Sequence, residues 1–235
     1  MKDYVILENE YFELLIPSSL KEFGQEVLEF STNKIKDYLD FFHESFGEKI
    51  KGAFLINRDD FIARVKEVRE DNSSLPPEWA TGCFYGGETQ ILLNKDNLYD
   101  RFLTLVHETF HLLFSKFIYE KNNVDRIVWL DEALAGNFDS STEKLIESGK
   151  FKDIIFELCK NKELLPKMCD LDFQKNNIIT DDYNGYDLFK VVGRYLIETK
   201  NSDELLEYVK NFEQVIIDGE SILDKSLEYF SSKFN

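Results

Sequence analysis

Residues 98–119 read LYDRFLTLVHETFHLLFSKFIY and carry the most informative pattern of the chain. Their large apolar residues recur at the three- and four-residue spacing of an amphipathic helix, namely Leu103, Val106, Phe110, Leu113, Phe114 and Phe117. The polar residues in the middle of this segment fall together on one strip: Thr104, His107, Glu108 and His111. The segment therefore predicts a helix with a buried apolar stripe and a short polar strip.

Strands are expected only before this helix. Short apolar runs bounded by turn residues predict strands at 4–7, 11–15, 50–56, 83–85 and 89–93. Between them, helices are expected at about 19–46 and 58–68, the first opened by a capping box of Ser19 and Glu22 and ended by Gly47. Later helices are expected from about 128 and at roughly 141–164, 183–199, 203–217 and 221–232. This order predicts an α+β fold, with a small antiparallel or mixed sheet beside a mostly helical C-terminal half.

Composition and charge exclude several classes of partner. Of the 235 residues, 43% are apolar, and the 21 Phe and 11 Tyr can fill a core without disulfides. Lys and Arg number 28 against 45 Asp and Glu, which gives a net charge of −17. A negative field of this size repels phosphate groups, so we expect no nucleic-acid partner and no anionic membrane surface.

The remaining composition favours a cytoplasmic protein. Three cysteines are present without CxxC spacing, which is typical of reduced thiols. The first 17 residues carry acids throughout, unlike a signal peptide. No stretch approaches the 18 or more apolar residues of a membrane span. The pattern does not specify an oligomeric state.

The polar strip of the central helix has the spacing of a metal site. His107 and His111 are four residues apart, so both imidazoles lie on one helical face within reach of a single cation. Imidazole nitrogen suits Zn²⁺. Glu108, next to His107, is placed to take a proton from a metal-bound water rather than to bind the metal. The third histidine, His43, is expected on the polar surface of the first long helix.

Two imidazoles leave a tetrahedral zinc ion one protein ligand short, with the last position kept for water. The next candidate is Glu132 in VWLDEALA at 128–135, 21 positions after His111. This separation leaves room for a turn near 122–123 and a second helix that returns toward the first. An acid at a helix N-terminus also has a simpler role, because it stabilises the helix dipole.

HETFH at 107–111 followed by WLDEALA at 129–135 resembles the gluzincin zinc peptidases, which include the thermolysins and the zinc aminopeptidases. That clan shares an HExxH and W-x-x-E-x-x-A pair at similar separation. The resemblance implies one Zn²⁺ per chain with His107, His111 and Glu132 as ligands, and Glu108 as general base. It also implies a single zincin-like catalytic unit over 1–235, with an α/β subdomain at 1–122 that holds the metal helix and a helical subdomain at 123–235.

The resemblance extends, with less specific motifs, to substrate and oxyanion groups. The clan has an edge strand before the metal helix that pairs with substrate backbone, and 89–93 is similar in placement, which implies substrate contacts at Ile91 and Leu92. A tyrosine that opens a later helix of the form Y-x8-Y-L is matched at 186–196. Tyr186 would then donate its phenol proton to the oxyanion, with Tyr183 the alternative.

The sequence also departs from the clan. Zinc aminopeptidases hold the substrate N-terminus with a G-x-M-E-N segment, which is missing here, and Glu88 is either its substitute or a turn-edge glutamate. Gly136 stands where thermolysins keep an acid that orients a histidine, so Asp131 or Asn137 would supply that contact. Cys83, just before the proposed edge strand, is a further candidate, which would cap the zinc in a latent state.

Together the motifs predict zinc-dependent hydrolysis of a peptide bond in a peptide or protein substrate. A metal-bound water would attack and Glu108 would act as general base. An endopeptidase is favoured because the clamp for a free N-terminus is missing. The alternatives are a zinc aminopeptidase and a non-catalytic zinc-binding interaction protein. The intact Glu108 argues against the last, because a structural zinc site needs no base.

Overall fold

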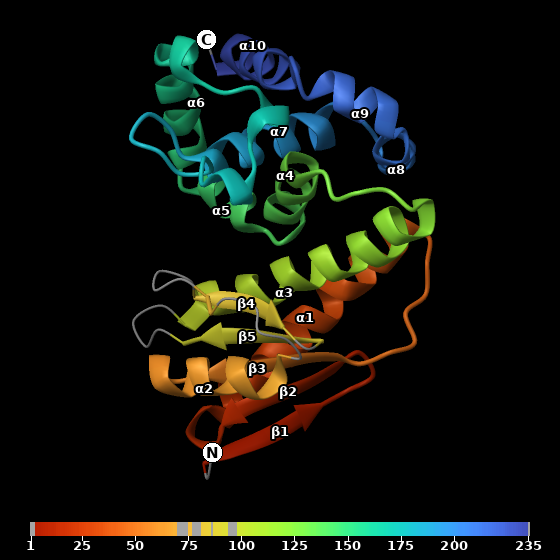
Figure 1. The fold of residues 1–235 in the computed structure, drawn as a ribbon, viewed down its shortest axis with the longest axis vertical. Helices are drawn as coiled ribbons and strands as arrows, with labels where there is room; N and C mark the ends of the chain where they lie inside the picture. The colour runs from red at the N-terminus through yellow and green to blue at the C-terminus, as the bar shows by residue number, and fades with distance from the viewer. Residues whose placement is uncertain (1–2, 70–74, 77–80, 86, 94–97, 235) are drawn as a thin grey trace. The chain divides into compact units, whose positions relative to one another are not determined.

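The computed structural model describes residues 3–69, 75–76, 81–85, 87–93 and 98–234. It confirms the α+β class: a five-stranded mixed sheet lies in the N-terminal part, and the C-terminal half is mostly helical (Figure 1). The chain forms two compact units, Met1–Phe110 and His111–Asn235. Their boundary falls inside helix α3 (Leu98–Phe114), the expected metal helix.

The sheet of the first unit has the strand order β1-β2-β3-β5-β4. Its strands are β1 (Tyr4–Glu8), β2 (Phe12–Pro17), β3 (Ile50–Leu55), β4 (Gly82–Tyr85) and β5 (Glu88–Leu92). The β1–β2 and β4–β5 pairs are antiparallel, and β3 is parallel to both β2 and β5. The expectation that 89–93 forms an edge is therefore wrong. β5 is paired on both sides, and the strand at that end of the sheet is β4.

Helices cover both faces of this sheet, which explains why β3 is almost continuously apolar. Phe54 of β3 meets Phe23 of α1 (Lys21–Phe42) edge to face, with 5.9 Å between ring centroids. The neighbouring residue Leu55 points to the other face and packs in one cluster with Phe61 of α2 (Arg58–Val68). In Figure 1, α2 accordingly lies in front of the sheet and α1 behind it.

The first long helix differs from the sequence prediction at both ends. It is preceded by a 3-10 turn at Ser18–Leu20, and its N-cap Leu20 makes no side-chain bond, so the expected capping box is absent. It ends at Phe42 rather than near 46, because His43 adopts a left-handed conformation with φ of 54°. The backbone N–H groups of the two residues that follow Phe42 then close the last turn by bonding to Asp40 O and Leu39 O.

Aromatic contacts fix α3 against α1. The ring of Tyr38 in α1 meets Phe110 of α3 edge to face at 5.3 Å, and its hydroxyl donates to Val106 O at 3.3 Å. Phe23 and Phe102 pack at 5.0 Å nearer the other end of α3. These contacts bury the apolar stripe predicted for this helix, so its polar strip points away from α1. After Phe114 the helix continues through one π-helical stretch at Ser115–Glu120.

The second unit is helical and is arranged around α4. Its helices are α4 (Val128–Phe138), α5 (Ser141–Glu147), α6 (Lys150–Lys160), α7 (Gly185–Thr199), α8 (Ser202–Lys210), α9 (Phe212–Asp218) and α10 (Ile222–Phe234). Every residue of α4 from Trp129 to Gly136 is buried. A helix that is buried all round lies at the centre of its unit, and α4 packs most extensively against α7.

Two helices expected to be continuous are broken. The helix expected at 141–164 is interrupted at Gly149, which has a φ of +77°, a conformation that favours glycine. The helix expected at 203–217 is interrupted at Asn211, whose side chain accepts a bond from Gln214 N and caps α9. Among the described residues, no helix is long and apolar enough to cross a membrane.

Candidate metal centre

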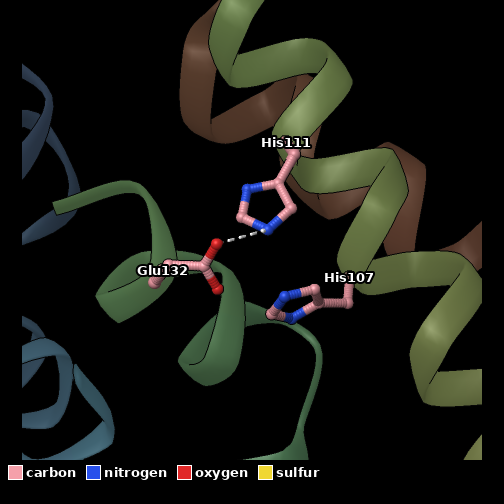
Figure 2. A group of neighbouring side chains, drawn as sticks. All are labelled: His107, His111 and Glu132. Atoms are coloured by element: carbon pink, nitrogen blue, oxygen red, sulfur yellow. Dashed lines mark ion pairs between the residues drawn. The ribbon is translucent and has the colours of Figure 1, made fainter. Parts of the chain in front are cut away.

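The two histidines of HETFH occupy one face of α3, as the spacing predicts. His107 and His111 are both half-buried, whereas Phe110, on the apolar stripe of the same helix, is completely buried. The helix therefore keeps the two imidazoles accessible one turn apart while its apolar stripe holds it in the core (Figure 2).

Helix α4 supplies two adjacent acids near its start, Asp131 in the first turn and Glu132 directly after it. Their side chains are only 3% and 6% exposed, because α4 is the buried centre of its unit. Buried carboxylates need partners to offset the loss of hydration, and His111 is one partner for both. Its Nδ1 lies 2.8 Å from Asp131 Oδ1. Its Nε2 lies 3.5 Å from Glu132 Oε1, the contact dashed in Figure 2.

His107, His111 and Glu132 form a group that could hold a metal ion: each offers a ligand atom, and these atoms lie within 4.8 Å of one another. The donor set fits a divalent transition metal, since two imidazole nitrogens and one carboxylate oxygen are ligands that Zn²⁺ accepts. Asp131 strengthens the fit. Its carboxylate accepts a hydrogen bond from Nδ1 of His111, which leaves the Nε2 lone pair for an ion. Of the two alternatives for this contact, Asp131 makes it.

Asn137, the other alternative, has a different role. Its side-chain amide donates to Ala133 O at 2.8 Å and to Lys190 O at 3.1 Å. It thereby joins α4 to α7 through their backbones.

The side chain of Arg126, which the sequence interpretation missed, contacts both acids of α4. Arg126 donates from Nε to Asp131 Oδ2 and from Nη2 to Glu132 Oε1, the latter at 2.7 Å. Burial lowers the pKa of Arg126, but the charges of Asp131 and Glu132 outweigh it and raise the pKa overall. The only signal in the sequence is a basic residue five and six positions before two adjacent acids, and such pairs are common.

Glu108, the expected general base, lies on α3 close to the end strand β4. A Cβ built on Gly82 of β4 would come within 4.0 Å of Glu108 Oε1 and within 2.7 Å of Thr104 Cγ2. Glycine at this position thus lets the strand backbone approach the polar strip of the helix. The end strand of the sheet and Glu108 are therefore neighbours within the first unit.

Cys83 takes no part in the group of potential ligands. Its side chain packs with the apolar cluster around α2, and its Sγ donates to Gln90 Oε1 at 3.6 Å. Burial, with a smaller effect of the Glu108 charge, raises the pKa of this thiol to about 12.

Glu88 stands at the turn end of β5, directly after Gly87, as one of the two sequence interpretations expects, but it is not exposed there. It is buried, and its carboxylate forms a bidentate pair with Arg64 of α2, at 2.8 Å from Nε and 2.5 Å from Nη2. The adjacent residues Ile91 and Leu92 belong to the inner strand β5, and Ile91 is completely buried. Both backbone edges of β5 are paired, one with β3 and one with β4, and the substrate contact expected at Ile91 and Leu92 stays a prediction.

The two candidate tyrosines differ in their environment. Tyr186 lies in the first turn of α7, half-buried, with its ring edge to face against Phe189 at 5.9 Å. The hydroxyl of Tyr183 instead donates to Asn177 O at 2.9 Å and holds the loop before α7. The catalytic role expected for Tyr186 stays a prediction.

Comparison of the chain with models of protein families, with curated proteins and with solved structures gave no match. The functional argument therefore rests on the residues and on their geometry.

Proposed function

We propose that the protein is a zinc-dependent peptidase of the gluzincin type. The observation that carries the proposal is the grouping of His107, His111 and Glu132, together with the bond from His111 Nδ1 to Asp131. A structural zinc site usually fills all four positions with protein side chains. Among the described residues this group offers three, which supports a site that keeps one position open for chemistry.

Zinc, when bound to these ligands, supplies a Lewis acid that polarises a peptide carbonyl and lowers the pKa of water. The chain supplies the proton transfers. Glu108 accepts a proton at its carboxylate from the attacking water and passes it to the nitrogen of the leaving amine. Tyr186 donates a hydrogen bond from its phenol to the oxyanion that forms at the carbonyl.

The substrate, in this proposal, is an extended peptide that adds to β4. Within the described residues β4 is paired only with β5, so its outer backbone groups can bond to another strand. The closeness of Gly82 to Glu108 supports this placement. The net charge of −17 favours basic peptides through long-range attraction at low salt.

The endopeptidase form of the proposal is favoured over an aminopeptidase. Glu88 was the one acid that the sequence offered to hold a free substrate N-terminus. Its carboxylate is instead buried and paired with Arg64. Peptides blocked at the N-terminus should therefore be cleaved as well as free ones, and a strict preference for free N-termini would exclude this form.

Glu108→Gln is the direct test of the proposed chemistry. The variant should keep its zinc and lose nearly all turnover of internally quenched peptides, because the amide cannot accept the proton. Glu120→Gln is the matched control, since Glu120 is an exposed acid on the continuation of the same helix, and its turnover should be unchanged. Full activity of zinc-loaded Glu108→Gln would end the proposed mechanism.

A further inference from the structure

Two adjacent acids at the start of α4, Asp131 and Glu132, share one cationic partner, Arg126. Asp131 and Glu132 are both buried, so each carboxylate needs hydrogen-bond donors to replace the water that it loses. The guanidinium of Arg126 contacts both acids at once.

The geometry of this contact fixes the carboxylates as well as compensating their charges. Arg126 uses Nε for Asp131 and Nη2 for Glu132, two donors held in one rigid plane. Each carboxylate thereby has one oxygen bonded to the guanidinium. The Glu132 oxygen that accepts from Arg126 is Oε1, the same atom that lies 3.5 Å from His111 Nε2. Holding this oxygen sets the distance between two of the three potential ligand atoms.

The guanidinium is itself held in place by the surrounding chain. Its Cζ lies 5.9 Å from the centre of the Phe173 ring, in the short 3-10 helix Phe173–Lys175. Arg126, Trp129 and Phe173 line one pocket of about 550 Å³ at the start of α4. The guanidinium thus has aromatic contact on one side and two carboxylates at its edge.

We propose that Arg126 is a positioning residue of the candidate metal site. It holds Asp131 and Glu132 in the arrangement that a metal ion needs before the ion binds. Asp131 in turn orients His111, so the effect of Arg126 reaches two of the three ligands. The inference rests on the metal site of the proposed function, but it concerns metal affinity rather than turnover.

The test is zinc affinity of the metal-stripped full chain, measured by competition with a chromophoric chelator at fixed pH. R126Q should bind zinc about 10–100-fold more weakly than wild type, the usual effect of losing a group that supports a ligand. R126K keeps the positive charge but lacks the planar guanidinium that reaches both acids. Its zinc affinity should therefore lie between those of wild type and R126Q.

R194Q is the matched control, because Arg194 also bridges two acids in the same unit. It donates from Nε to Glu198 at 2.7 Å and from Nη1 to Glu143 at 2.8 Å, away from the candidate ligands. R194Q and R126Q should both lower the melting temperature of the metal-free protein, but R194Q should bind zinc as wild type does. This contrast separates a positioning role from general stability.

The outcomes are distinguishable. Zinc binding by R126Q that equals or exceeds that of wild type would overturn the role of Arg126 and leave the proposed function standing. Should R126Q fail to fold, wild-type affinity in R126K would overturn it equally. Wild-type protein that binds no zinc would overturn the proposed function and this inference together.

Discussion

The Nδ1 atom of His111 lies 2.8 Å from Oδ1 of Asp131, the residue directly before Glu132 in the sequence. One turn of α4 therefore provides both a potential ligand and the group that orients another. Asp131→Ala should weaken zinc binding about 10–100-fold, because the imidazole loses its fixed orientation and tautomer. Asp131→Asn keeps an acceptor oxygen and should lose much less. Chelator competition checks both, and wild-type affinity in Asp131→Ala would show that His111 needs no such partner.

Phenylalanine substitutions at Tyr186 and Tyr183 should have different effects, the first on turnover and the second on the free energy of unfolding. Tyr186→Phe should lower turnover by about 2.7–4 kcal/mol of transition-state stabilisation, as for a typical oxyanion donor. Tyr183→Phe should leave turnover intact and cost about 1 kcal/mol of unfolding free energy, because its hydroxyl bonds to Asn177 O. Peptidase kinetics and urea unfolding of both variants show which hydroxyl acts in turnover and which stabilises the fold. Loss of turnover in Tyr183→Phe alone would reverse the assignment.

The crossing of α4 and α7 depends on Gly193. A Cβ there would stand 2.0 Å from Ala133 O and 2.4 Å from Asn137 Nδ2, so the backbones would have to separate. Gly193→Ala should destabilise the protein by about 3 kcal/mol in urea unfolding. Gly136→Ala is the control on the same crossing, since its nearest neighbour, Lys190 Cγ, is 3.6 Å away. That change should be neutral or slightly stabilising, and equal losses in both variants would refute the explanation.

The ligand residues of this site can be predicted from their spacing in the sequence, whereas the residues and strand around them cannot. His107 and His111 share a face because four residues make about one helical turn, so HETFH alone predicts their arrangement. Glu132 follows from its distance along the chain and from the resemblance. Arg126 could not be predicted, because its partners depend on how the chain turns into α4. The position of β4 at the end of the sheet depends likewise on strand order, which periodicity leaves open.

Helix ends show the same limit. The sequence predicts α2 at its observed bounds, and the structure shows that the side chain of Asn57 caps its start. The sequence misses the breaks at Gly149 and Asn211, where it predicts continuous helices. Backbone conformation at one residue decides such breaks, and the side-chain pattern around it does not.

Glu198 should make stability depend on pH. Burial raises the pKa of this carboxyl, but bonds from Lys233, Arg194 and Tyr229 outweigh it and lower the pKa below the ordinary 4.5. An acid with a lowered folded-state pKa stabilises the protein above its unfolded pKa, and this contribution is lost as the pH falls through the folded value. Glu198→Gln should therefore be less stable than wild type at pH 7, by about 1 kcal/mol.

The difference between Glu198→Gln and wild type should shrink as the pH falls below about 4.5 and disappear once the carboxyl is protonated. Urea unfolding at several pH values measures this difference. A constant difference from pH 7 to pH 3 would show that the ionised carboxylate is not its source.

The central claim is that His107, His111 and Glu132 bind one zinc ion. Elemental analysis of the purified protein beside Glu132→Ala tests it most directly. The account predicts one zinc per chain in the wild type and its loss in the variant, because two imidazoles alone hold zinc weakly. A wild type without zinc, or a variant that retains it, would contradict the claim and leave HETFH as part of a helical core.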